Sequence, residues 1–194
     1  MGGLTPLTTV DFPGELSTVV FCQGCPWHCR YCHNGHLLPA RGAGRIPWLE
    51  IRRFLAQRRG LLDAVVFSGG EPTLQGALPA AMAEVKALGF KVGLHTAGPS
   101  PGRLRRLLPH LDWVGLDIKA LPEDYPEITG VAGSGEKAWK SLELLLDARV
   151  ALQVRTTPMP GMDAPDRLDR LARRLSAAGV DRHLVQERRL ASRR

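Results

Sequence analysis

The sequence of 194 residues lacks any long apolar run, and its longest apolar stretches are only a few residues. A helix that spans a bilayer needs about 20 consecutive apolar residues, so we expect no membrane segment. The first residues also lack the charged, apolar and small-residue regions of a secretory signal peptide. We therefore expect a cytoplasmic protein, whose thiols stay reduced and form no disulfides.

Internal repeats and low-complexity tracts are absent as well. A chain of this length buries one sizeable core but is short for two, so we expect a single domain over residues 1–194. The formal net charge is +7, and basic residues clustered on one face would indicate nucleic-acid binding. The arginines are instead scattered over several expected helices. We interpret them as solvated helix faces and expect no nucleic-acid partner, with an acidic protein partner as the second interpretation.

The cysteines lack the second pair of ligands that a structural zinc site normally uses. Three of the four cysteines form the pattern C-x3-C-x2-C directly after an apolar run, namely Cys25, Cys29 and Cys32. Three thiolates can hold three corners of a cubane iron–sulfur cluster and leave one iron open for another molecule. The alternative is a local zinc site completed by His28, His33 or Cys22. We interpret Cys22, which ends the apolar run, as a buried core thiol.

Apolar, β-branched segments alternate with amphipathic helical patterns, which indicates a parallel α/β architecture. We expect six strands, near 17–22, 64–68, 91–95, 113–118, 150–156 and 183–187. We expect five helices, near 47–59, 77–88, 102–109, 136–148 and 164–178. These counts predict a partial (β/α)6 TIM-like barrel with parallel strands, open on one side. A long irregular segment, the cysteine loop at 23–46, is unusual in a compact domain and suggests function.

Ligands of such folds bind at the carboxyl ends of the strands, and the informative residues lie there. Gly69 and Gly70 let the backbone approach a ligand closely, and Glu71 adds an anion beside it. This turn would suit an α-amino acid, or it is simply a tight strand-to-helix turn with Glu71 at the helix N-terminus. Asp117 and Lys119 alternate with aliphatic residues and so point to the opposite face of the strand. They either bind something or lie at a solvent-exposed strand end.

The loop Cys25–Asn34, the turn Ser68–Pro72 and the strand end Leu116–Lys119 together resemble the radical S-adenosylmethionine (SAM) enzymes. The segment Asp11–Gly14 and the Cys-His-Asn end of the loop are similar to the activating enzymes of glycyl-radical enzymes. The resemblance is greatest to the activating proteins of anaerobic ribonucleoside-triphosphate reductases. It runs from about Leu4 to Thr157.

The resemblance implies a [4Fe-4S] cluster whose ligands are Cys25, Cys29 and Cys32, with SAM bound at the open iron. It places the remaining cofactor contacts on Tyr31, Asn34, Gly69, Gly70, Glu71, Thr96, Asp117 and Lys119. One electron would split SAM, and the resulting 5′-deoxyadenosyl radical would take a glycine Cα hydrogen from a partner enzyme. The substrate would be a peptide loop of that glycyl-radical enzyme, contacted near Asp11, which alternatively caps a turn. Flavodoxin or ferredoxin would donate the electron.

The sequence departs from the family pattern at His95, where the family commonly has an acid that can help to hold a monovalent cation. We interpret Arg155 as a surface arginine at a strand end, with a SAM contact as the alternative. Two other functions stay open. The first is a radical SAM enzyme that acts on a small metabolite, similar to 7-carboxy-7-deazaguanine synthase. The second is a non-catalytic module that binds zinc or nucleic acid.

Overall fold

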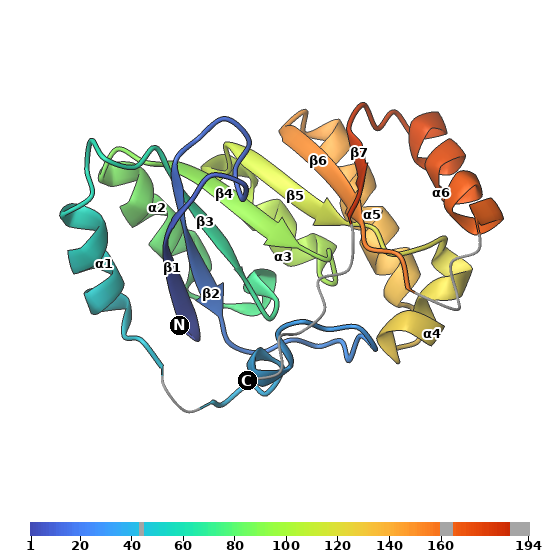
Figure 1. The fold of residues 1–194 in the computed structure, drawn as a ribbon, viewed down its shortest axis with the longest axis horizontal. Coiled ribbons are helices and arrows are strands. Elements are labelled where there is room, and N and C mark those ends of the chain that lie inside the picture. Colours follow the sequence, from blue (N-terminus) through green and yellow to red (C-terminus); the bar gives the residue numbers. More distant parts are fainter. Residues whose placement is uncertain (43–44, 160–164, 187–194) are drawn as a thin grey trace.

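The computed structural model describes residues 1–42, 45–159 and 165–186, and these form one seven-stranded sheet flanked by helices (Figure 1). The strands follow the chain in spatial order: β1 (Gly3–Thr8), β2 (Ser17–Cys22), β3 (Ala64–Gly69), β4 (Lys91–Thr96), β5 (Trp113–Asp117), β6 (Ala151–Thr156) and β7 (His183–Val185). The strands β2 to β7 are parallel to their neighbours, whereas β1 pairs antiparallel with β2. Since β1 and β7 lie at opposite edges, the sheet is not closed.

Helices connect the parallel strands, as the right-handed crossover of such sheets requires. They are α1 (Trp48–Ala56), α2 (Leu78–Ala87), α3 (Pro101–Leu107), α4 (Tyr125–Thr129), α5 (Ser134–Asp147) and α6 (Pro165–Ala177). Short 3-10 turns adjoin the strand ends and helices: η1 (Gly35–Leu37), η2 (Pro72–Leu74), η3 (Leu108–His110) and η4 (Pro122–Asp124). None of the described helices is long and apolar enough to cross a membrane.

The predicted partial barrel is confirmed, and the six expected strands appear as β2 to β7. The five expected helices appear as α1, α2, α3, α5 and α6. Residue 187 of the last expected strand and residue 164 of the last expected helix lie outside the described residues. The antiparallel strand β1 and the short helix α4 were not predicted.

The two faces of the sheet are both covered by apolar side chains, as is usual for parallel strands. Because side chains alternate along a strand, Val65 of β3 joins the large core beneath the helices, whereas Val66 joins a small core on the opposite face. This second core consists of Phe12, Val19, Ala64, Val66 and Trp113. It fills the concave face near the amino ends of the strands, so polar groups can gather near their carboxyl ends.

Candidate active site

The cysteine loop begins directly after β2 and is fastened to its own returning stretch. The backbone N–H of Gly24 donates to the carbonyl of Leu37 at 2.8 Å, and that of Cys25 donates to the carbonyl of Leu38 at 3.0 Å. The glycine is also sterically useful, because a Cβ at Gly24 would lie only 3.4 Å from the Cα of Ala40. The entry and exit of the loop therefore lie side by side.

Helix α4 holds the middle of the loop. The backbone N–H groups of His28 and Arg30 donate to the carbonyls of Thr129 and Ile128, at 3.0 and 3.1 Å. Trp27 is buried and meets the ring of Tyr125 edge to face, with centroids 5.9 Å apart. The unpredicted helix thus positions the segment between the first two cysteines of the motif.

The thiols of the motif differ in exposure. Cys25 and Cys29 are half-buried, Cys32 is exposed, and Cys22 is fully buried, as expected for a core residue. Burial raises the pKa of Cys25 to about 11, a hydrogen bond from the Trp27 backbone lowers it, and the negative charges of Glu71, Cys29 and Cys32 raise it further. The three thiols of the motif therefore lie close enough to interact electrostatically.

This donor set suits an iron–sulfur cluster, since thiolates are its usual protein ligands and mutual repulsion among thiolates is relieved by a bound cationic core. Within residues 1–42, 45–159 and 165–186, no group of three His, Cys, Asp or Glu side chains is arranged to hold a single metal ion. The ligation of a cluster by Cys25, Cys29 and Cys32 stays a prediction.

The two glycines after β3 pack against the chain that enters the cysteine loop. A Cβ at Gly69 would collide with the backbone of Cys22, and one at Gly70 would collide with the carbonyl of Gly24. Hydrogen bonds close the contact, from Gly70 N to the Cys22 carbonyl (2.9 Å) and from Glu71 N to the Gly24 carbonyl (2.8 Å). The close approach that these glycines permit is thus to the protein's own backbone, and their predicted contact with SAM stays a prediction.

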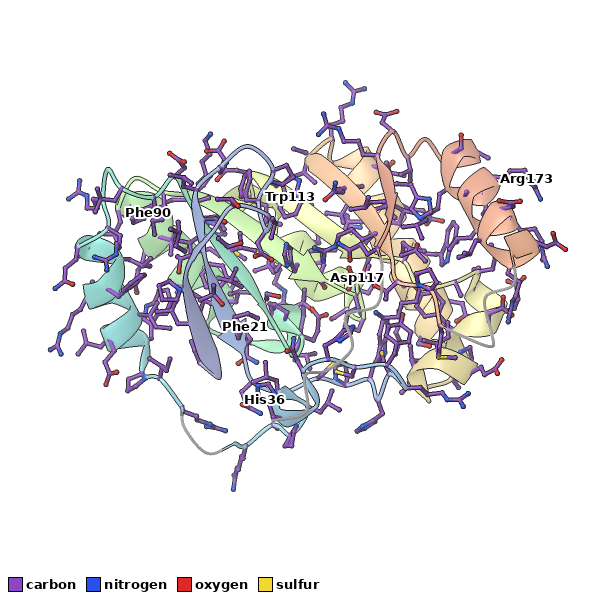
Figure 2. All side chains as sticks on the ribbon, viewed as in Figure 1. Phe21, His36, Phe90, Trp113, Asp117 and Arg173 are labelled. Carbon is purple, nitrogen blue, oxygen red and sulfur yellow. The ribbon has the colours of Figure 1, made fainter. Side chains whose placement is uncertain are left out.

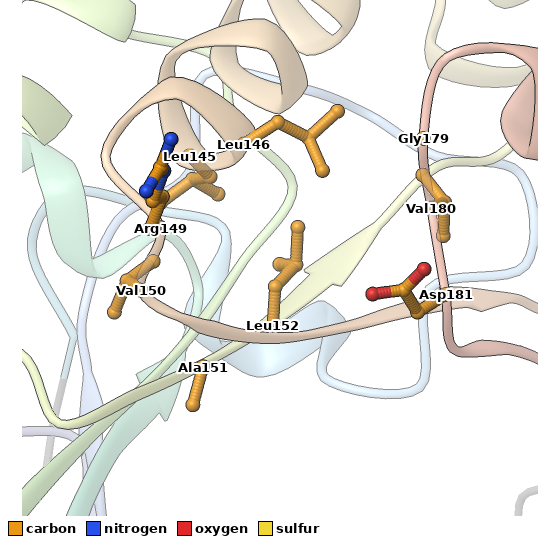
Figure 3. Close-up of a pocket in the computed structure, with 9 residues that line it drawn as sticks. All are labelled: Leu145, Leu146, Arg149, Val150, Ala151, Leu152, Gly179, Val180 and Asp181. Atoms are coloured by element: carbon orange, nitrogen blue, oxygen red, sulfur yellow. The ribbon is translucent and has the colours of Figure 1, made fainter.

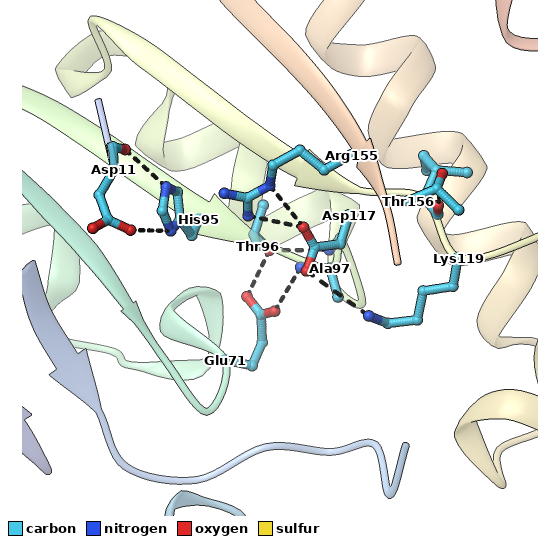
Figure 4. Close-up of polar contacts among 11 residues, drawn as sticks. Asp11, Glu71, His95, Thr96, Ala97, Asp117, Lys119, Arg155 and Thr156 are labelled. Carbon is cyan, nitrogen blue, oxygen red and sulfur yellow. Dashed lines mark hydrogen bonds and ion pairs between the residues drawn. The ribbon is translucent and has the colours of Figure 1, made fainter. Parts of the chain in front are cut away.

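The Glu71 carboxylate is buried and joins the ends of β3 and β4 (Figure 4). Its Oε1 accepts from the backbone N–H of Thr73 (3.0 Å) and from the hydroxyls of Thr73 (2.6 Å) and Thr96 (2.7 Å), and its Oε2 accepts from Ala97 N at 3.1 Å. Burial raises the pKa of Glu71, although these hydrogen bonds oppose the rise. Only Oε2 has spare acceptor capacity for a ligand.

Asp11 lies beside His95, although the two are far apart in the sequence (Figure 4). The His95 ring donates from Nε2 to the Asp11 carbonyl at 2.9 Å, and its Nδ1 lies 3.9 Å from Asp11 Oδ1. The Asp11 carboxylate also accepts from the Thr8 hydroxyl at 2.7 Å. Burial and the nearby charge of Arg155 lower the pKa of His95 to about 4, so the ring is neutral at neutral pH.

Asp117, at the end of β5, is paired with two cations (Figure 4). Arg155 donates to Asp117 Oδ1 from Nε at 3.0 Å, its Nη2 lies 2.8 Å from the same oxygen, and Lys119 Nζ lies 3.8 Å from Oδ2. Burial alone would raise the pKa of Asp117, but the charges of Arg155 and Lys119 outweigh it and lower the pKa. The carboxylate is therefore ionised and held from both sides.

The interpretation of Arg155 as a surface arginine was wrong, because its side chain is only 12% exposed and pairs with Asp117. The two residues are direct partners in the β5–β6 register. A Cβ at Gly115, two residues before Asp117, would lie 3.0 Å from the Arg155 guanidinium carbon. The glycine therefore makes room for the guanidinium, and the pairing depends on the β5–β6 register, which spacing along the sequence does not give.

Lys119 connects the end of β5 to the cysteine loop. Its Nζ lies 5.4 Å from the centroid of the Tyr31 ring, and its backbone N–H donates to the Tyr125 hydroxyl at 2.9 Å. Burial alone would lower the pKa of Lys119, but its electrostatic interactions with Tyr31, Asp117 and Cys29 outweigh it and raise the pKa. The ammonium therefore keeps its charge beside the second cysteine of the motif.

Two loop residues complete the predicted set. The Tyr31 hydroxyl is buried and has no hydrogen-bond partner in the part of the chain that the structure describes. Asn34 precedes η1, and its carbonyl accepts from Leu37 N at 2.8 Å. The structure thus gathers the predicted residues at the carboxyl ends of the strands, while Asp11 approaches from the β1–β2 connection.

A separate groove of about 350 Å³ lies at the opposite end of the strands (Figure 3). It is formed where α5 leads into β6 and where α6 leads into β7, and its lining includes Leu145, Arg149, Leu152, Val180 and Asp181. None of the predicted site residues lines it. The candidate active site is therefore the group of polar side chains beside the cysteine loop, which we call the polar side-chain group: Glu71, His95, Asp117, Lys119 and Arg155.

Comparison with known proteins gives both a family and relatives. A sequence model of the Radical SAM superfamily matches residues 19–175. A protein of Methanocaldococcus jannaschii, whose name assigns it provisionally to the glycyl-radical enzyme activating enzymes, is 32% identical over 175 residues. The match covers 86% of this chain and 71% of that protein. The pyruvate formate-lyase-activating enzyme of Clostridium pasteurianum is 37% identical over 135 residues, which cover 65% of this chain and 55% of that enzyme.

The fold is also found in solved structures. The crystal structure of Streptococcus suis SuiB bound to S-adenosylmethionine has a TM-score of 0.70 with this chain at 16% identity. The alignment covers 90% of this chain and 41% of that one. At so low an identity, the likeness shows a shared fold.

Proposed function

The chain belongs to the radical SAM superfamily, and from this premise we propose that it activates a glycyl-radical enzyme, with anaerobic ribonucleotide reductase as the expected partner. The predicted resemblance to the activating enzymes of glycyl-radical enzymes in general is confirmed by the relatives from Methanocaldococcus jannaschii and Clostridium pasteurianum. The identity of the partner, the whole chain as one domain and the cytoplasmic location stay predictions.

The observation that carries the proposal is the position of Lys119. Its charged ammonium lies between the Tyr31 ring and the Asp117 carboxylate, and it acts electrostatically on the Cys29 thiol. A cluster ligand, an aromatic ring, an anion and a cation thus meet in one place. This combination fits a ligand with a sulfonium, an aromatic base and an amino-acid moiety, which is the chemistry of SAM.

In this proposal each residue of the site has a separate role. Cys25, Cys29 and Cys32 hold the [4Fe-4S] cluster and leave one iron open. Tyr31 lies along the adenine, and Lys119 receives the SAM carboxylate by a charge-assisted hydrogen bond. Asp117 holds Lys119 in place and can accept from a ribose hydroxyl.

The turn after β3 serves the amino group of the ligand. Gly69 and Gly70 offer backbone carbonyls, Glu71 Oε2 adds an acceptor, and the Thr96 hydroxyl fixes that carboxylate. Asn34 contacts the ligand from the end of the cysteine loop, and Asp11 meets the peptide loop of the partner enzyme.

A cluster held by Cys25, Cys29 and Cys32 would supply the one-electron reduction of SAM, and with it the radical chemistry that removes a hydrogen atom from the glycine Cα of the partner. The chain's own part is to orient SAM and to keep the peptide glycine within reach. Binding and orientation of this kind account for much of an enzyme's rate enhancement.

The test is anaerobic reconstitution with iron and sulfide, followed by chemical reduction in the presence of SAM. We expect 5′-deoxyadenosine from the wild-type protein and none from Cys29→Ala. Addition of the partner enzyme should then give the electron paramagnetic resonance signal of a glycyl radical. 5′-Deoxyadenosine without a protein radical would indicate a small-molecule substrate, and one bound zinc in place of iron would refute the proposal.

A further inference from the structure

Part of the polar side-chain group is a balanced set of charges around His95. Asp117 pairs with Arg155 and with Lys119, and His95 lies beside a second carboxylate, that of Asp11 (Figure 4). The neutral imidazole adds no charge of its own. The formal charges of the two carboxylates and the two cations therefore cancel.

Arg155 is fixed in place by the sheet. Its backbone carbonyl accepts from Ile118 N at 2.9 Å, and the residue is the direct register partner of Asp117. Its side chain is only 12% exposed, and Gly115 leaves room for the guanidinium. Asp117 lies near the middle of the view in Figure 2, away from α6, which carries Arg173 at the right edge. Because arginine stays protonated in proteins, the sheet holds a permanent positive charge at this point.

The residues at this point do not fit a monovalent cation. The family commonly has an acid at the position of His95, and such an acid would bring a third carboxylate to the two cations. One negative charge would then be left for an exchangeable ion. His95 removes that charge, and its side chain is only 10% exposed. Potassium ions bind through oxygen atoms, whereas imidazole nitrogen suits transition metals. A potassium or sodium ion therefore loses both a charge and an oxygen ligand here.

The oxygens that remain nearby already have partners. Asp117 Oδ1 accepts from Arg155 Nε at 3.0 Å and lies 2.8 Å from its Nη2. The Thr96 hydroxyl donates to Glu71 Oε1 at 2.7 Å and accepts from Gly98 N at 3.0 Å. An added cation would have to displace these partners and would lie close to the guanidinium, where like charges repel.

We propose that the Arg155 guanidinium is the fixed counter-ion of this site and that the chain binds SAM without a monovalent cation. The inference rests on the proposed function, because it concerns SAM bound beside Lys119. Arg155 acts through Asp117 and is therefore a positioning residue. It occupies Oδ1 of that carboxylate and leaves Oδ2 to Lys119, which receives the SAM carboxylate in the proposed function.

A purely structural ion pair makes a different prediction. Removal of one partner of a buried pair leaves an uncompensated charge and lowers stability, whatever salt is present. A counter-ion has a second property, because a small cation from solution can take its place once the guanidinium is gone. The kind of cation in the buffer therefore separates the two roles.

The experiment measures SAM binding to the reconstituted holoprotein by anaerobic equilibrium dialysis, with the cluster oxidised so that SAM is not consumed. Potassium, sodium and tetramethylammonium chloride are compared at equal ionic strength, since tetramethylammonium is too large to replace either ion. We expect the wild-type Kd to agree within about twofold in the three salts. A wild-type Kd that is about tenfold weaker in tetramethylammonium would overturn the proposal.

Two variants should create the cation site that the wild-type residues do not fit. In Arg155→Ala, Asp117 keeps Lys119 alone, so SAM should bind about tenfold more weakly in tetramethylammonium and regain most of that affinity in potassium or sodium. In His95→Asp, the added carboxylate should make binding about tenfold tighter in potassium or sodium than in tetramethylammonium. Arg155→Lys, which keeps the charge, should bind SAM equally in the three salts.

The matched controls change the same kinds of residue elsewhere. Arg52→Ala removes an arginine from its ion pair with Glu84, and His110→Asp adds a carboxylate in η3, before β5. Both should bind SAM equally in the three salts. Sodium NMR gives a second readout, since the line should broaden only with Arg155→Ala and His95→Asp.

Equal binding in the three salts by folded Arg155→Ala or by His95→Asp would overturn the proposal, because neither would then have gained a cation site. A cation dependence in the two controls would overturn it as well. The wild-type comparison and His95→Asp keep the test decisive if Arg155→Ala does not fold.

The outcomes distinguish the two proposals. If the holoprotein binds SAM equally in the three salts but yields no 5′-deoxyadenosine on reduction, the proposed function fails while the counter-ion proposal stands. If 5′-deoxyadenosine forms only with potassium or sodium, the counter-ion proposal alone fails. If the holoprotein binds no SAM in any of the salts, both fail together.

Discussion

At the scale of single residues, the candidate site is a set of charges whose states are fixed by their neighbours. Asp117 is ionised because Arg155 and Lys119 flank it, and His95 is neutral because it is buried near the Arg155 guanidinium. A protonated His95 would place a third cation beside the Arg155–Asp117 pair. The neutral ring instead uses Nε2 to hold the Asp11 carbonyl.

The neutral His95 makes stability depend on pH. Its pKa falls from an ordinary 6.5 to about 4 on folding, so the unfolded chain takes up the proton first as pH decreases. Stability is therefore fully present above pH 6.5 and is lost as the pH falls toward 4, by up to about 3 kcal/mol from this residue. His95→Gln, which keeps a donor for the Asp11 carbonyl, should flatten this decline.

Urea unfolding of the cluster-free protein at a series of pH values measures the effect. The control is His36→Gln, since His36 is exposed and should leave the slope of stability against pH unchanged. An equal slope of stability against pH in the wild-type protein and in His95→Gln would show that folding does not lower the His95 pKa.

Single residues also show what the sequence could predict. Spacing placed Asp117 and Lys119 on the face opposite the aliphatic residues, and the structure shows them paired there. The partner of Asp117 could not be found by spacing, because Arg155 reaches it across the sheet from 38 residues away. Likewise, Gly69 and Gly70 were predicted to let the backbone approach a ligand, whereas their immediate neighbour is the backbone of residues 22 and 24.

At the scale of elements, the alternation of strands and helices was predictable because each parallel strand is followed by an amphipathic helix. β1 was not predicted because it contains Pro6 and is only partly buried, so it lacks the apolar run of the other strands. α4 has five residues, too few for a helical period to show. Both elements are stabilised by tertiary contacts, which a local pattern does not contain.

The pairing of β5 with β6 leads to a prediction about Gly115. An added methyl group would lie 2.8 Å from the Trp113 ring and 3.0 Å from the Arg155 guanidinium carbon. Gly115→Ala should therefore cost about 1–3 kcal/mol of stability, because the close-packed strands leave no room. Gly102→Ala is the control, since nothing lies within 4 Å of that position.

A double-mutant cycle in urea identifies which neighbour is displaced. In an Arg155→Ala background, Gly115→Ala should cost markedly less, because the guanidinium is gone. Equal costs in the two backgrounds would assign the strain to Trp113 and would remove Gly115 from the account of the Asp117 pair.

The hydroxyls of Tyr125 and Tyr31 differ in their hydrogen bonds, which predicts different effects on stability when each tyrosine is replaced by phenylalanine. The Tyr125 hydroxyl accepts the backbone N–H of Lys119, so Tyr125→Phe leaves a buried donor unpaired and should cost about 1–3 kcal/mol. The Tyr31 hydroxyl is buried with no partner in the described chain, so Tyr31→Phe should leave stability unchanged or raise it. Urea unfolding of the cluster-free variants compares them directly. A larger loss for Tyr31→Phe than for Tyr125→Phe would contradict the described contacts.

At the scale of the whole molecule, the open barrel has two cores of unequal size. The large one lies between the helices and the sheet, and the small one lies on the concave face. A closed barrel would fill its concave side with strand residues alone. Here the β1–β2 connection contributes Phe12, which packs on Trp113 with ring centroids 5.3 Å apart.

Phe12 should therefore affect both the stability of the fold and the pKa of His95 in the candidate site. Phe12→Ala should cost about 3–5 kcal/mol, since it removes a buried aromatic ring from a core that has few other members. It should also release the neighbouring Asp11 carbonyl from His95 and admit water, so the His95 pKa should rise from about 4 toward 6.5. Urea unfolding measures the stability, and an NMR titration of the imidazole protons measures the His95 pKa.

Val10→Ala is the matched control in the same connection, because Val10 is 72% exposed and should change neither the stability nor the His95 pKa. A stability loss in Phe12→Ala without a shift of the His95 pKa would show that the core on the concave face stabilises the fold but does not affect the protonation of His95.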